Sequence, residues 1–479
     1  MWSPRSSIFE GGHEKDSSQV RLERFVAGGS RSAELQGMRT AVVTTYFPSV
    51  SQTFVLDQIT GLRARGHEVD IYALGPEPNS AGVVPRVERD ALADRTYYQP
   101  RTPRHPVARA LGIPNLLRGA WRGRAGTAIR TVRRTAAEPI GVLYEGAPFL
   151  GHGPYDAILC HFGSNGERAL RVRDAGMVEG PIVTAFHGAD MSRYVRMHGA
   201  AVYRDLFARG DLFLPVSAYW ATRLEELGCP TDRIAVHHMG IDLSRFKFTV
   251  PRTPTVDQPV RVVSVARLVE KKGMPYAIRA VAALRRDGVD IVLDIVGDGP
   301  LRSSLESLIA ELGMSNAVRI IGARSRDEVA RVMAGAHLFA APSVTARDGD
   351  MEGIPVALME AMASGVPVVA TRHSGIPELV EDKVSGLLVP ERDTDALAAA
   401  FRWLVEHPER WMGMALAAHD AVERSFNGER LNDELVAMLE NVRARGSREV
   451  GVGSPSRIVS STALGEEGRS APRSGAPSA

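Results

Sequence analysis

Short apolar runs alternate with helical patterns along most of the chain, and the alternation occurs in two successive halves. Alternating strands and helices are typical of parallel α/β sheets. Between the halves, residues 243–259 are polar, contain prolines and show no hydrophobic periodicity, as expected of a linker. The length of 479 residues is also too great for one ordinary domain. We therefore predict two α/β domains, with a ligand cleft at the carboxyl ends of their strands.

The pattern predicts the individual elements. In the first half the predicted strands are 40–45, 68–74, 157–161, 182–186, 212–216 and 234–237, with helices that include 52–65 and 219–227. In the second half the predicted strands are 261–265, 291–296, 318–321, 338–341 and 367–371, with helices at 274–286, 300–312 and 327–334. Three more helices are predicted at 397–406, 408–424 and 430–441. The polar ends, 1–37 and 446–479, are expected to be disordered.

The composition excludes few classes of protein. Hydrophobic residues make up 44% and charged residues 24% of the chain, which is typical of a soluble globular enzyme, and a net charge of +2 gives no sign of a nucleic-acid partner. Cys160 and Cys229 lack the spacing of a zinc site or a disulfide framework. We expect them to be buried, reduced thiols in a cytoplasmic protein. No apolar run reaches membrane-spanning length, so membrane contact is expected to be peripheral, on the inner face of the cell membrane.

Two glutamates lie on either side of the start of one further predicted helix. Pro355 suits the first helical position, and Gly365 suits the stop before the next strand. Glu352 lies just before this helix and Glu360 about one and a half turns inside it. A helix N-terminus attracts phosphate, so two acids beside it fit a nucleotide-sugar, which has sugar hydroxyls on both sides of a diphosphate. Two solvated acids on a helix surface would fit the same spacing.

Basic residues follow the first strand of the second half. Arg267 comes directly after this strand, and Lys272 lies five residues further on. The chain has only five lysines among its 58 basic residues, so the pair Lys271 and Lys272 stands out. An arginine and a lysine at the carboxyl end of a strand would neutralise a diphosphate and the charge that develops on it during transfer. The alternative is a solvated basic loop.

Three other motifs have weaker interpretations. The segment 297–300 begins like a dinucleotide fingerprint, but Arg302 stands where the third glycine is required, which argues against a dehydrogenase. Asp348, Asp350 and Glu352 resemble a cation-binding loop, but no further acid follows at a chelating spacing, so we predict no bound metal. His187 follows an apolar strand directly, a position that is more often structural than functional when the histidine is alone.

The segment 352–369 resembles a known family. Its pattern, E-G-x-P-x-x-x-x-E followed by A-M-A-S-G-V-P-V-V, resembles the E-x(7)-E signature of retaining glycosyltransferases of family 4. The resemblance implies an α/β GT-B fold, in which two Rossmann-like domains face a central cleft. It implies an acceptor-binding domain over 38–242, the linker 243–259, a nucleotide-sugar-binding domain over 260–425 and a helix over 426–445 that returns to the first domain.

The resemblance also implies roles for individual residues. Glu360 would bind the ribose hydroxyls, while Glu352 and His187, the latter in an H-G-x-D motif, would contact the hexose. Arg267 and Lys272, in the pattern R-x-x-x-x-K-G, would hold the phosphates. The V-G-x-G-P, E-G-I-P and S-G-I-P-E segments would line the donor pocket with Gly297, Gly299, Gly353, Ile354, Ser374 and Gly375. The donor implied is a UDP- or GDP-sugar, with no metal and no other cofactor.

A narrower likeness covers most of residues 40–440. The motifs F-P-x-x-S-x-T-F, R-G-H-E-V-D-I-Y, R-G-D-L-F-L-P-V-S and D-G-D-M-E-G-I-P resemble bacterial glycosyltransferases of colanic-acid and amylovoran-type exopolysaccharide pathways. One departure from the wider family is residues 46–55, which replace the Gly-Gly loop that many members carry after the first strand. A backbone phosphate contact is therefore not carried over to this loop.

A basic stretch has no place in the nucleotide chemistry. Residues 95–137 contain ten arginines and no acid, interspersed with Trp121 and several aliphatic residues. This pattern fits contact with an anionic membrane, as a polyprenyl-diphosphate-linked acceptor would require, and equally fits a solvated Arg-rich loop. No motif for nucleic-acid binding accompanies it.

We therefore expect a retaining hexosyltransferase that acts in exopolysaccharide or lipid-linked glycan assembly. Three alternatives remain at this point: transfer to a soluble secondary metabolite such as an aminocyclitol, a GT-B nucleotide-sugar epimerase, and a non-catalytic module that binds nucleotide-sugars.

Overall fold

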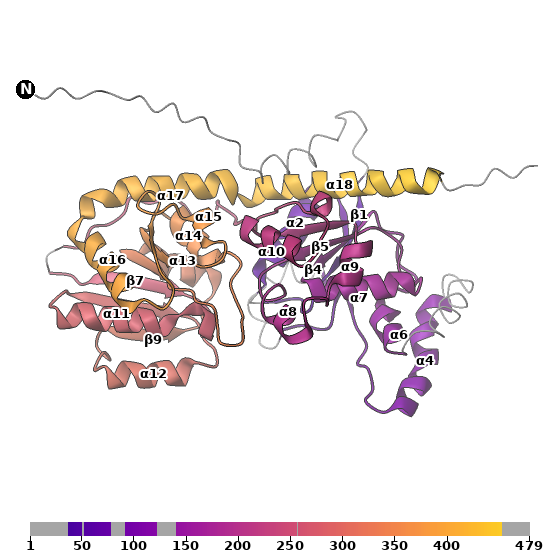
Figure 1. Ribbon diagram of the computed structural model, residues 1–479, viewed down its shortest axis with the longest axis horizontal. Coiled ribbons are helices and arrows are strands. Elements are labelled where there is room, and N and C mark those ends of the chain that lie inside the picture. The colour runs from indigo at the N-terminus through magenta and orange to yellow at the C-terminus, as the bar shows by residue number, and fades with distance from the viewer. Residues whose placement is uncertain (1–36, 50–51, 78–91, 122–139, 256, 453–479) are drawn as a thin grey trace, which may run out of the picture.

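The computed structural model describes residues 37–49, 52–77, 92–121, 140–255 and 257–452. They form two α/β domains that lie side by side, with the long helix α18 (Gly428–Val452) running along the first domain (Figure 1). The segments 1–36 and 453–479, for which the sequence predicts disorder, lie outside the described residues. Residues 446–452, predicted as part of the disordered tail, instead continue α18.

The first domain contains one parallel sheet of six strands covered by helices. Its strands are β1 (Arg39–Val43), β2 (Glu68–Ala73), β3 (Thr96–Tyr98), β4 (Ala157–His161), β5 (Ile182–Phe186) and β6 (Leu212–Pro215). Its helices are α2 (Thr53–Ala64), α4 (Pro106–Trp121), α6 (Gly141–Gly146), α7 (Gly163–Asp174), α8 (Arg193–His198), α9 (Arg204–Arg209) and α10 (Ala218–Glu226).

The second domain repeats this architecture. Its strands are β7 (Val260–Val265), β8 (Ile291–Val296), β9 (Val318–Gly322), β10 (Leu338–Ala341), β11 (Val368–Thr371) and β12 (Leu387–Val389). Its helices are α11 (Met274–Arg286), α12 (Arg302–Glu311), α13 (Arg326–Ala334), α14 (Val356–Ala363), α15 (Ile376–Leu379), α16 (Thr394–Glu406) and α17 (Trp411–Ser425).

Both sheets have the same strand order. The first runs β3-β2-β1-β4-β5-β6 and the second runs β12-β11-β10-β7-β8-β9. Numbered within its own domain, each sheet therefore has the order 3-2-1-4-5-6, which is the Rossmann order. In such sheets ligands bind beyond the carboxyl ends of the strands. The predicted α/β class with two Rossmann-like domains is confirmed.

The hydrophobic patterns of the strands follow from burial on two faces. Every residue of β4 and β5 is buried, because helices cover both sides of a parallel sheet and leave neither face to solvent. Some of the helices begin at a side chain that accepts one of their first N–H groups. Ser217 accepts from Trp220 at the start of α10, and Asp393 accepts from Ala396 at the start of α16.

Helix α18 connects the two domains. Leu435, Met438 and Leu439 are buried in the first domain, in the same core as residues of α2. Arg65 at the end of α2 pairs with Glu429 and Asp433 of α18, at 3.1 Å and 2.6 Å. The end of the chain that follows the second sheet is thus packed on the first domain, which fixes the two domains at one end.

Three element predictions were wrong. The short strands β3 and β12 were missed, and residues 234–237 form no strand, only a bridge between Phe213 and Ile234. The N–H groups of Ala235 and His237 bond to the carbonyls of Phe213 and Pro215, but Pro215 has no N–H to return a bond. The ladder therefore ends at β6. Among the described helices, none is both long enough and apolar enough to cross a membrane.

Candidate active site

Glu352 is buried at the interface of the two domains, in the loop between β10 and α14. Its Oε2 lies 3.0 Å from Lys272 Nζ, and its Oε1 lies 3.5 Å from Lys271 Nζ. Lys271 Nζ also lies 3.1 Å from Asp350 Oδ1. We call these four residues the acid–lysine cluster. Burial alone would raise the pKa of Glu352, but Lys272 and then Lys271 outweigh it and lower that pKa to about 2. Glu352 is therefore a fixed negative charge.

The acids of this loop are each paired with a cation of the protein. Asp348 Oδ2 lies 3.1 Å from Arg193 Nε, and Asp350 and Glu352 are paired with the lysines of the cluster. Among the residues that the structure describes, no group of three or more His, Cys, Asp or Glu side chains is arranged to hold a metal ion. The acids of the loop thus bind lysines and an arginine.

Helix α14 carries the second glutamate. The helix begins at Val356, and Pro355 is its N-cap with extended backbone, not the first helical residue as predicted. Gly365 follows the helix with φ +84°, the left-handed conformation that suits a glycine stop. Glu360 lies within the helix, and its pKa is raised to about 7. Burial is the largest cause, Arg326 opposes it by lowering the pKa, and Asp57 adds to it by raising the pKa.

An ion pair joins the two domains beside Glu360. Arg326, at the start of α13, donates to both carboxylate oxygens of Asp57 in α2, at 3.0 Å and 3.3 Å. The two residues are 269 positions apart in sequence. Because a bidentate pair has a defined geometry, it fixes the separation of α2 and α13 near Glu360.

Arg267 and the glycines of the V-G-x-G-P segment lie at the ends of β7 and β8. Arg267 is exposed, and its guanidinium makes no ion pair or hydrogen bond with any described residue. Gly297 has φ +144°, and a Cβ added there would lie 1.8 Å from the carbonyl oxygen of Ala266. A Cβ at Gly299 would lie 2.6 Å from the carbonyl oxygen of Leu268. These glycines therefore let the loop after β8 pack against the loop after β7, which carries Arg267.

His187 follows β5 and is held by its neighbours. The carboxylate of buried Asp190 accepts the N–H groups of His187 and Gly188, at 3.0 Å and 2.9 Å. The ring of His187 packs on Phe54 with 4.7 Å between centroids, and its Nε2 lies 3.1 Å from Nδ1 of His161. Burial, followed by the neighbouring histidines, lowers the pKa of His187 well below its usual value. The imidazole is therefore neutral at physiological pH.

The loops that carry His187 and Glu352 touch across the two domains. A Cβ added at Gly353 would lie 2.7 Å from the carbonyl oxygen of His187. The indole Nε1 of Trp220 donates to the carbonyl oxygen of Glu352 at 3.2 Å. Glu378 accepts the N–H groups of Ala218 and Tyr219 at the start of α10, at 2.8 Å and 2.9 Å. The loop after β5 and the start of α10 thus meet the loops after β10 and β11.

The remaining predicted pocket residues belong to this contact. Ile354 is buried, and Ser374 Oγ donates to the carbonyl oxygen of Glu352 at 2.7 Å. A Cβ added at Gly375 would lie 2.8 Å from Cβ of Ser217 and 2.9 Å from Ile354 Cγ1. The structure therefore brings His187, Glu352, Gly353, Ile354, Ser374 and Gly375 together, with Lys272 bonded to Glu352.

Gly353 offers a direct test of this contact. In Gly353→Ala the new methyl would meet the His187 carbonyl at 2.7 Å and Val216 Cγ2 at 3.0 Å, both in the other domain. We expect the domains to separate and the radius of gyration in small-angle scattering to rise. The rate of the predicted sugar transfer should fall by at least about tenfold, because His187 and Glu352 are then misplaced relative to each other. The matched control is Gly413→Ala on α17, where nothing lies within 4 Å. An unchanged rate and unchanged scattering for Gly353→Ala would show that the contact is not needed.

Comparison with known proteins identifies the family of the chain. Residues 51–245 match the model of Glycosyltransferase Family 4, and residues 247–418 match the model of Glycosyl transferases group 1. The chain is 40% identical over 412 residues to an Escherichia coli protein named as a colanic acid biosynthesis glycosyltransferase, WcaL, covering 84% of this chain and 100% of the relative. The chain belongs to this glycosyltransferase family. It is therefore a transferase of sugar groups.

Two further relatives match most of the length of this glycosyltransferase in sequence. It is 37% identical over 418 residues to the amylovoran biosynthesis glycosyltransferase AmsK of Erwinia amylovora, covering 85% of this chain and 100% of the relative. It is 31% identical over 370 residues to a GDP-mannose-dependent alpha-(1-6)-phosphatidylinositol monomannoside mannosyltransferase of Mycolicibacterium smegmatis, covering 76% of this chain and 87% of the relative. The predicted likeness to colanic-acid and amylovoran-type enzymes is confirmed.

A solved structure supports the fold. Anabaena Alr3699/HepE, determined in complex with UDP-glucose, matches with a TM-score of 0.62 and 19% identity, covering 84% of this chain and 99% of that chain. At this identity the match concerns the fold alone. The fold of this glycosyltransferase is GT-B, as the sequence predicted.

Several residues at the site were not predicted from the sequence. Asp57 and Arg326 join the domains, and His373 and Glu391 lie behind Glu352. The partners of these bonds are far apart in sequence or lie in different domains, so local spacing carries no signal for them. Lys271 had one signal: it is one of only five lysines and lies next to Lys272.

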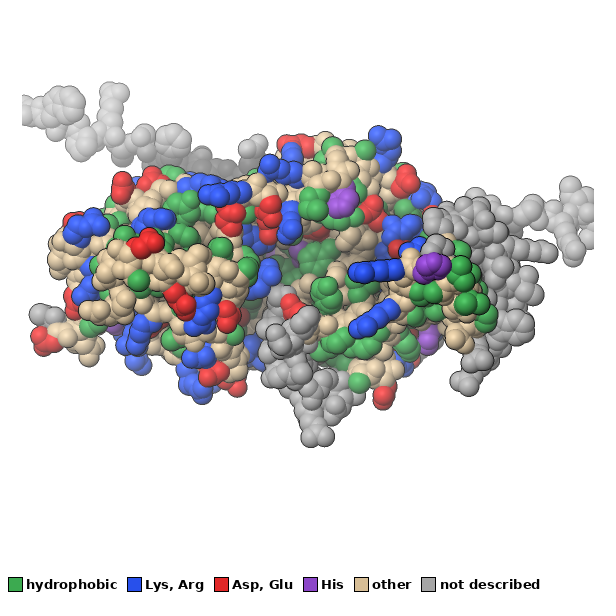
Figure 2. Space-filling model, turned by 90° about the horizontal axis from the view of Figure 1, so that it is seen from below, with side chains coloured by type: hydrophobic (Ala, Val, Ile, Leu, Met, Phe, Trp, Pro, Cys, Tyr) green, Lys and Arg blue, Asp and Glu red, His purple; other side chains and the backbone are tan. Residues whose placement is uncertain are grey.

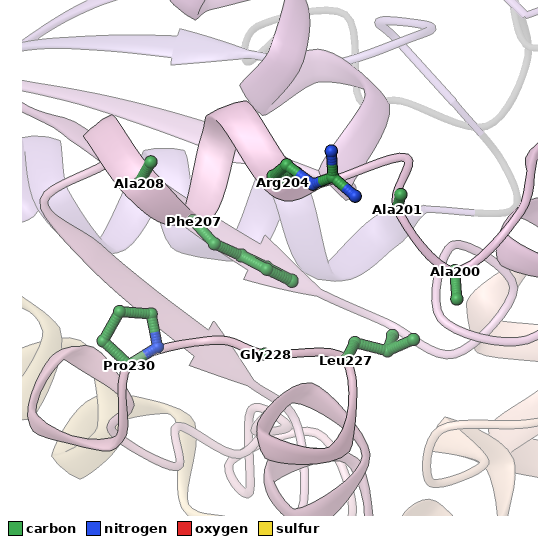
Figure 3. A pocket seen from close by; sticks show the side chains of 8 residues that line it. All are labelled: Ala200, Ala201, Arg204, Phe207, Ala208, Leu227, Gly228 and Pro230. Carbon is green, nitrogen blue, oxygen red and sulfur yellow. The ribbon is translucent and has the colours of Figure 1, made fainter.

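Two open pockets of the glycosyltransferase differ in their distance from the acid–lysine cluster: the first lies away from it, and the second borders it through Gly349 and Met351. One, of about 540 Å³, is bounded by Arg204 and Phe207 of α9 and by the turn 227–230 (Figure 3). Another, of about 760 Å³, is lined by residues of both domains, including Tyr219 and Met351. None of the residues that line the first pocket belongs to the predicted site.

Proposed function

We propose that this glycosyltransferase moves a hexose from a nucleoside-diphosphate sugar to an acceptor hydroxyl, with retention of anomeric configuration. One observation carries the proposal: Glu352 is buried between Lys271 and Lys272 and contacts the His187 loop of the other domain. Eight residues further on, Glu360 lies half-buried within α14. Carboxylates and cations thus lie near one interdomain contact. A bound sugar–diphosphate–ribose needs both, since its hydroxyls bond to carboxylates and its diphosphate to cations.

Each end of the donor has matching groups in this proposal. Lys272 and Arg267 neutralise the diphosphate, and Glu360 accepts hydrogen bonds from the ribose hydroxyls. Glu352 and His187 bind the hexose. In this proposal Gly297, Gly299, Gly353, Ile354, Ser374 and Gly375 would line the donor site between these groups.

The chemistry assigned to the protein is positioning and charge stabilisation. When the bond between C1 of the hexose and the diphosphate oxygen breaks, negative charge grows on that oxygen, and Lys272 and Arg267 stabilise it. With retention, the acceptor oxygen bonds to C1 on the face that the diphosphate leaves. The proton of the acceptor hydroxyl passes to the departing diphosphate. Neutral His187 is suited to a hydrogen bond with a sugar hydroxyl.

Relatives support both kinds of donor nucleotide. The M. smegmatis relative is GDP-mannose-dependent, and HepE was determined with UDP-glucose. We therefore propose a UDP- or GDP-hexose. The WcaL and AmsK relatives support a place in exopolysaccharide assembly.

The surface of the first domain supports a lipid-linked acceptor, such as a polyprenyl-diphosphate glycan at an anionic membrane. On α4, Val107 and Leu111 are 58% and 74% exposed, and Arg101 and Arg104 near its start are exposed. On the face in Figure 2, the half built by the first domain carries many hydrophobic side chains together with basic ones. Residues 122–137 of the Arg-rich stretch lie outside the described residues. Apolar and basic side chains together are what an anionic lipid surface attracts.

One assay tests the proposal. The protein is incubated with UDP-glucose or GDP-mannose, labelled in the sugar, and with a lipid extract that contains polyprenyl-linked saccharides. We expect label in the lipid phase, in a linkage with the anomeric configuration of the donor. Transfer only to a water-soluble acceptor would contradict the lipid-linked acceptor. A changed donor sugar without any acceptor would indicate an epimerase, and binding without turnover of either donor would indicate a binding module.

A further inference from the structure

His373 lies directly behind Glu352 and is fully buried. It follows β11, and its Nε2 lies 3.0 Å from the backbone nitrogen of Glu352. Its other ring nitrogen, Nδ1, lies 2.5 Å from Oε1 of Glu391, which follows β12. A histidine and a second acid therefore connect the ends of two neighbouring strands to the main chain of Glu352.

The bonds on both sides fix the tautomer of His373. A backbone N–H can only donate, so Nε2 of His373 must accept and carries no proton. In the neutral ring the proton is then on Nδ1, where it is donated to the carboxylate of Glu391. The other tautomer would place two N–H groups opposite each other at Glu352.

Glu391 is itself held in place. Its Oε2 accepts the backbone N–H of Thr345 at 2.7 Å, and its Oε1 lies 3.4 Å from the Thr345 hydroxyl. Thr345 belongs to the same loop as Glu352. The loop is therefore bonded at two points, Thr345 and Glu352, to one Glu391–His373 pair.

The main chain of Glu352 is bonded on both of its polar groups. His373 accepts its N–H, and Ser374 and Trp220 donate to its carbonyl oxygen at 2.7 Å and 3.2 Å. With the backbone fixed, the carboxylate has a defined direction toward Lys271 and Lys272. Buried side chains that fix a functional residue in this way determine how well it is pre-positioned for a ligand.

We propose that His373 and Glu391 are positioning residues that orient Glu352 and thereby determine affinity for the sugar half of the donor. The proposal rests on the proposed function, in which Glu352 binds the hexose. It separates the two halves of the donor: the Glu391–His373 pair acts on hexose binding through Glu352, whereas the nucleotide half is bound by Glu360 and the cations.

The test compares each donor with its own nucleotide by calorimetric titration. The probes are UDP-glucose against UDP and GDP-mannose against GDP. For His373→Phe, which removes the acceptor, we expect affinity for the sugar-nucleotide to fall by at least about tenfold more than affinity for the nucleotide. His373→Gln, whose side-chain oxygen can accept the Glu352 N–H, should recover part of the loss. The matched control is His337→Phe, because His337 Nδ1 accepts the N–H of Arg261 at 2.9 Å, at the amino ends of the strands of the same sheet, opposite the candidate site. It should leave both affinities unchanged.

The outcomes separate this inference from the proposed function. An equal loss for sugar-nucleotide and nucleotide, or no loss in a folded His373→Phe variant, would overturn the inference. If that variant does not fold, Glu391→Gln carries the test, with the same selective loss expected and the same two results overturning it. If the wild-type protein binds neither nucleotide nor sugar-nucleotide, the proposed function falls, and this inference falls with it.

Discussion

Replacing Lys272 with alanine is expected to lower the rate of sugar transfer by at least about 100-fold, because it removes a cation from the departing diphosphate. Lys272 Nζ lies 3.0 Å from Glu352 Oε2 at the interdomain contact, so its charge is held at the predicted diphosphate site. The rate is measured as label transferred from the sugar-nucleotide under saturating donor. A rate within about threefold of wild type would contradict the role given to this lysine.

The same substitution is expected to destabilise the fold. Without Lys272, buried Glu352 keeps only Lys271, whose Nζ is 3.5 Å from its Oε1. Removing one partner of a buried ion pair costs on the order of 3 kcal/mol, because the remaining charge is uncompensated. We expect a lower melting temperature for Lys272→Ala than for Lys247→Ala, a matched control on an exposed lysine outside the cluster. Assays are therefore run well below the melting temperature of the variant, so that lost activity is not confused with unfolding.

Affinity for the nucleotide is expected to rise with pH through about 7, because of Glu360. Burial raises the pKa of this carboxyl to about 7, and only the ionised form accepts hydrogen bonds from both ribose hydroxyls. Between pH 6 and pH 8 the ionised fraction rises about tenfold, so affinity for UDP or GDP should rise by up to that factor. Glu360→Gln should bind the nucleotide more weakly at pH 8 and show a flatter pH dependence. Titration calorimetry at several pH values measures both effects.

The stability of the ligand-free protein should fall as pH rises through about 7, whereas affinity for the nucleotide rises. The pKa of Glu360 is raised above its usual value of 4.5, so the folded state holds this proton more tightly than the unfolded state does. The stabilisation linked to this proton is present below pH 4.5 and is lost as pH rises through 7. Relative to wild type, Glu360→Gln should therefore gain stability at pH 8, by up to about 3 kcal/mol. Equal melting temperatures for the two proteins at pH 5 and at pH 8 would show that the pKa of Glu360 is not raised in the folded protein.

The sequence predicted the fold well where the apolar runs were long. Strands such as β4 and β5 are buried along their whole length and read as continuous apolar runs. The strands β3 and β12 have only three residues each, which is too short for a pattern to form. Residues 234–237 have the composition of a strand, but Pro215 in the neighbouring strand supplies no N–H for pairing. That failure depends on which strand lies alongside and is invisible in the local pattern.

The sequence named residues of the candidate site but not the bonds between them. Strand ends and the helix start pointed to Arg267, Lys272 and Glu352, because ligands bind at the carboxyl ends of parallel strands, and His187 was named from its strand end together with the H-G-x-D resemblance. The contacts that complete the site join residues that the chain brings together only on folding. Arg326 with Asp57 crosses the domains, and His373 with Glu391 joins two strand ends. The loop after β10 was considered as a cation loop, but its acids are paired with Arg193 and two lysines.

A crystal structure of the protein with bound UDP or GDP tests the central claim most directly. The account predicts both ribose hydroxyls within hydrogen-bonding distance of the Glu360 carboxylate, and the diphosphate oxygens in contact with Lys272 and Arg267. The terminal phosphate should point toward Glu352 and His187, where the hexose would follow. A nucleotide bound elsewhere, or a diphosphate that contacts neither cation, would contradict the assignment of this interdomain contact as the nucleotide-sugar site.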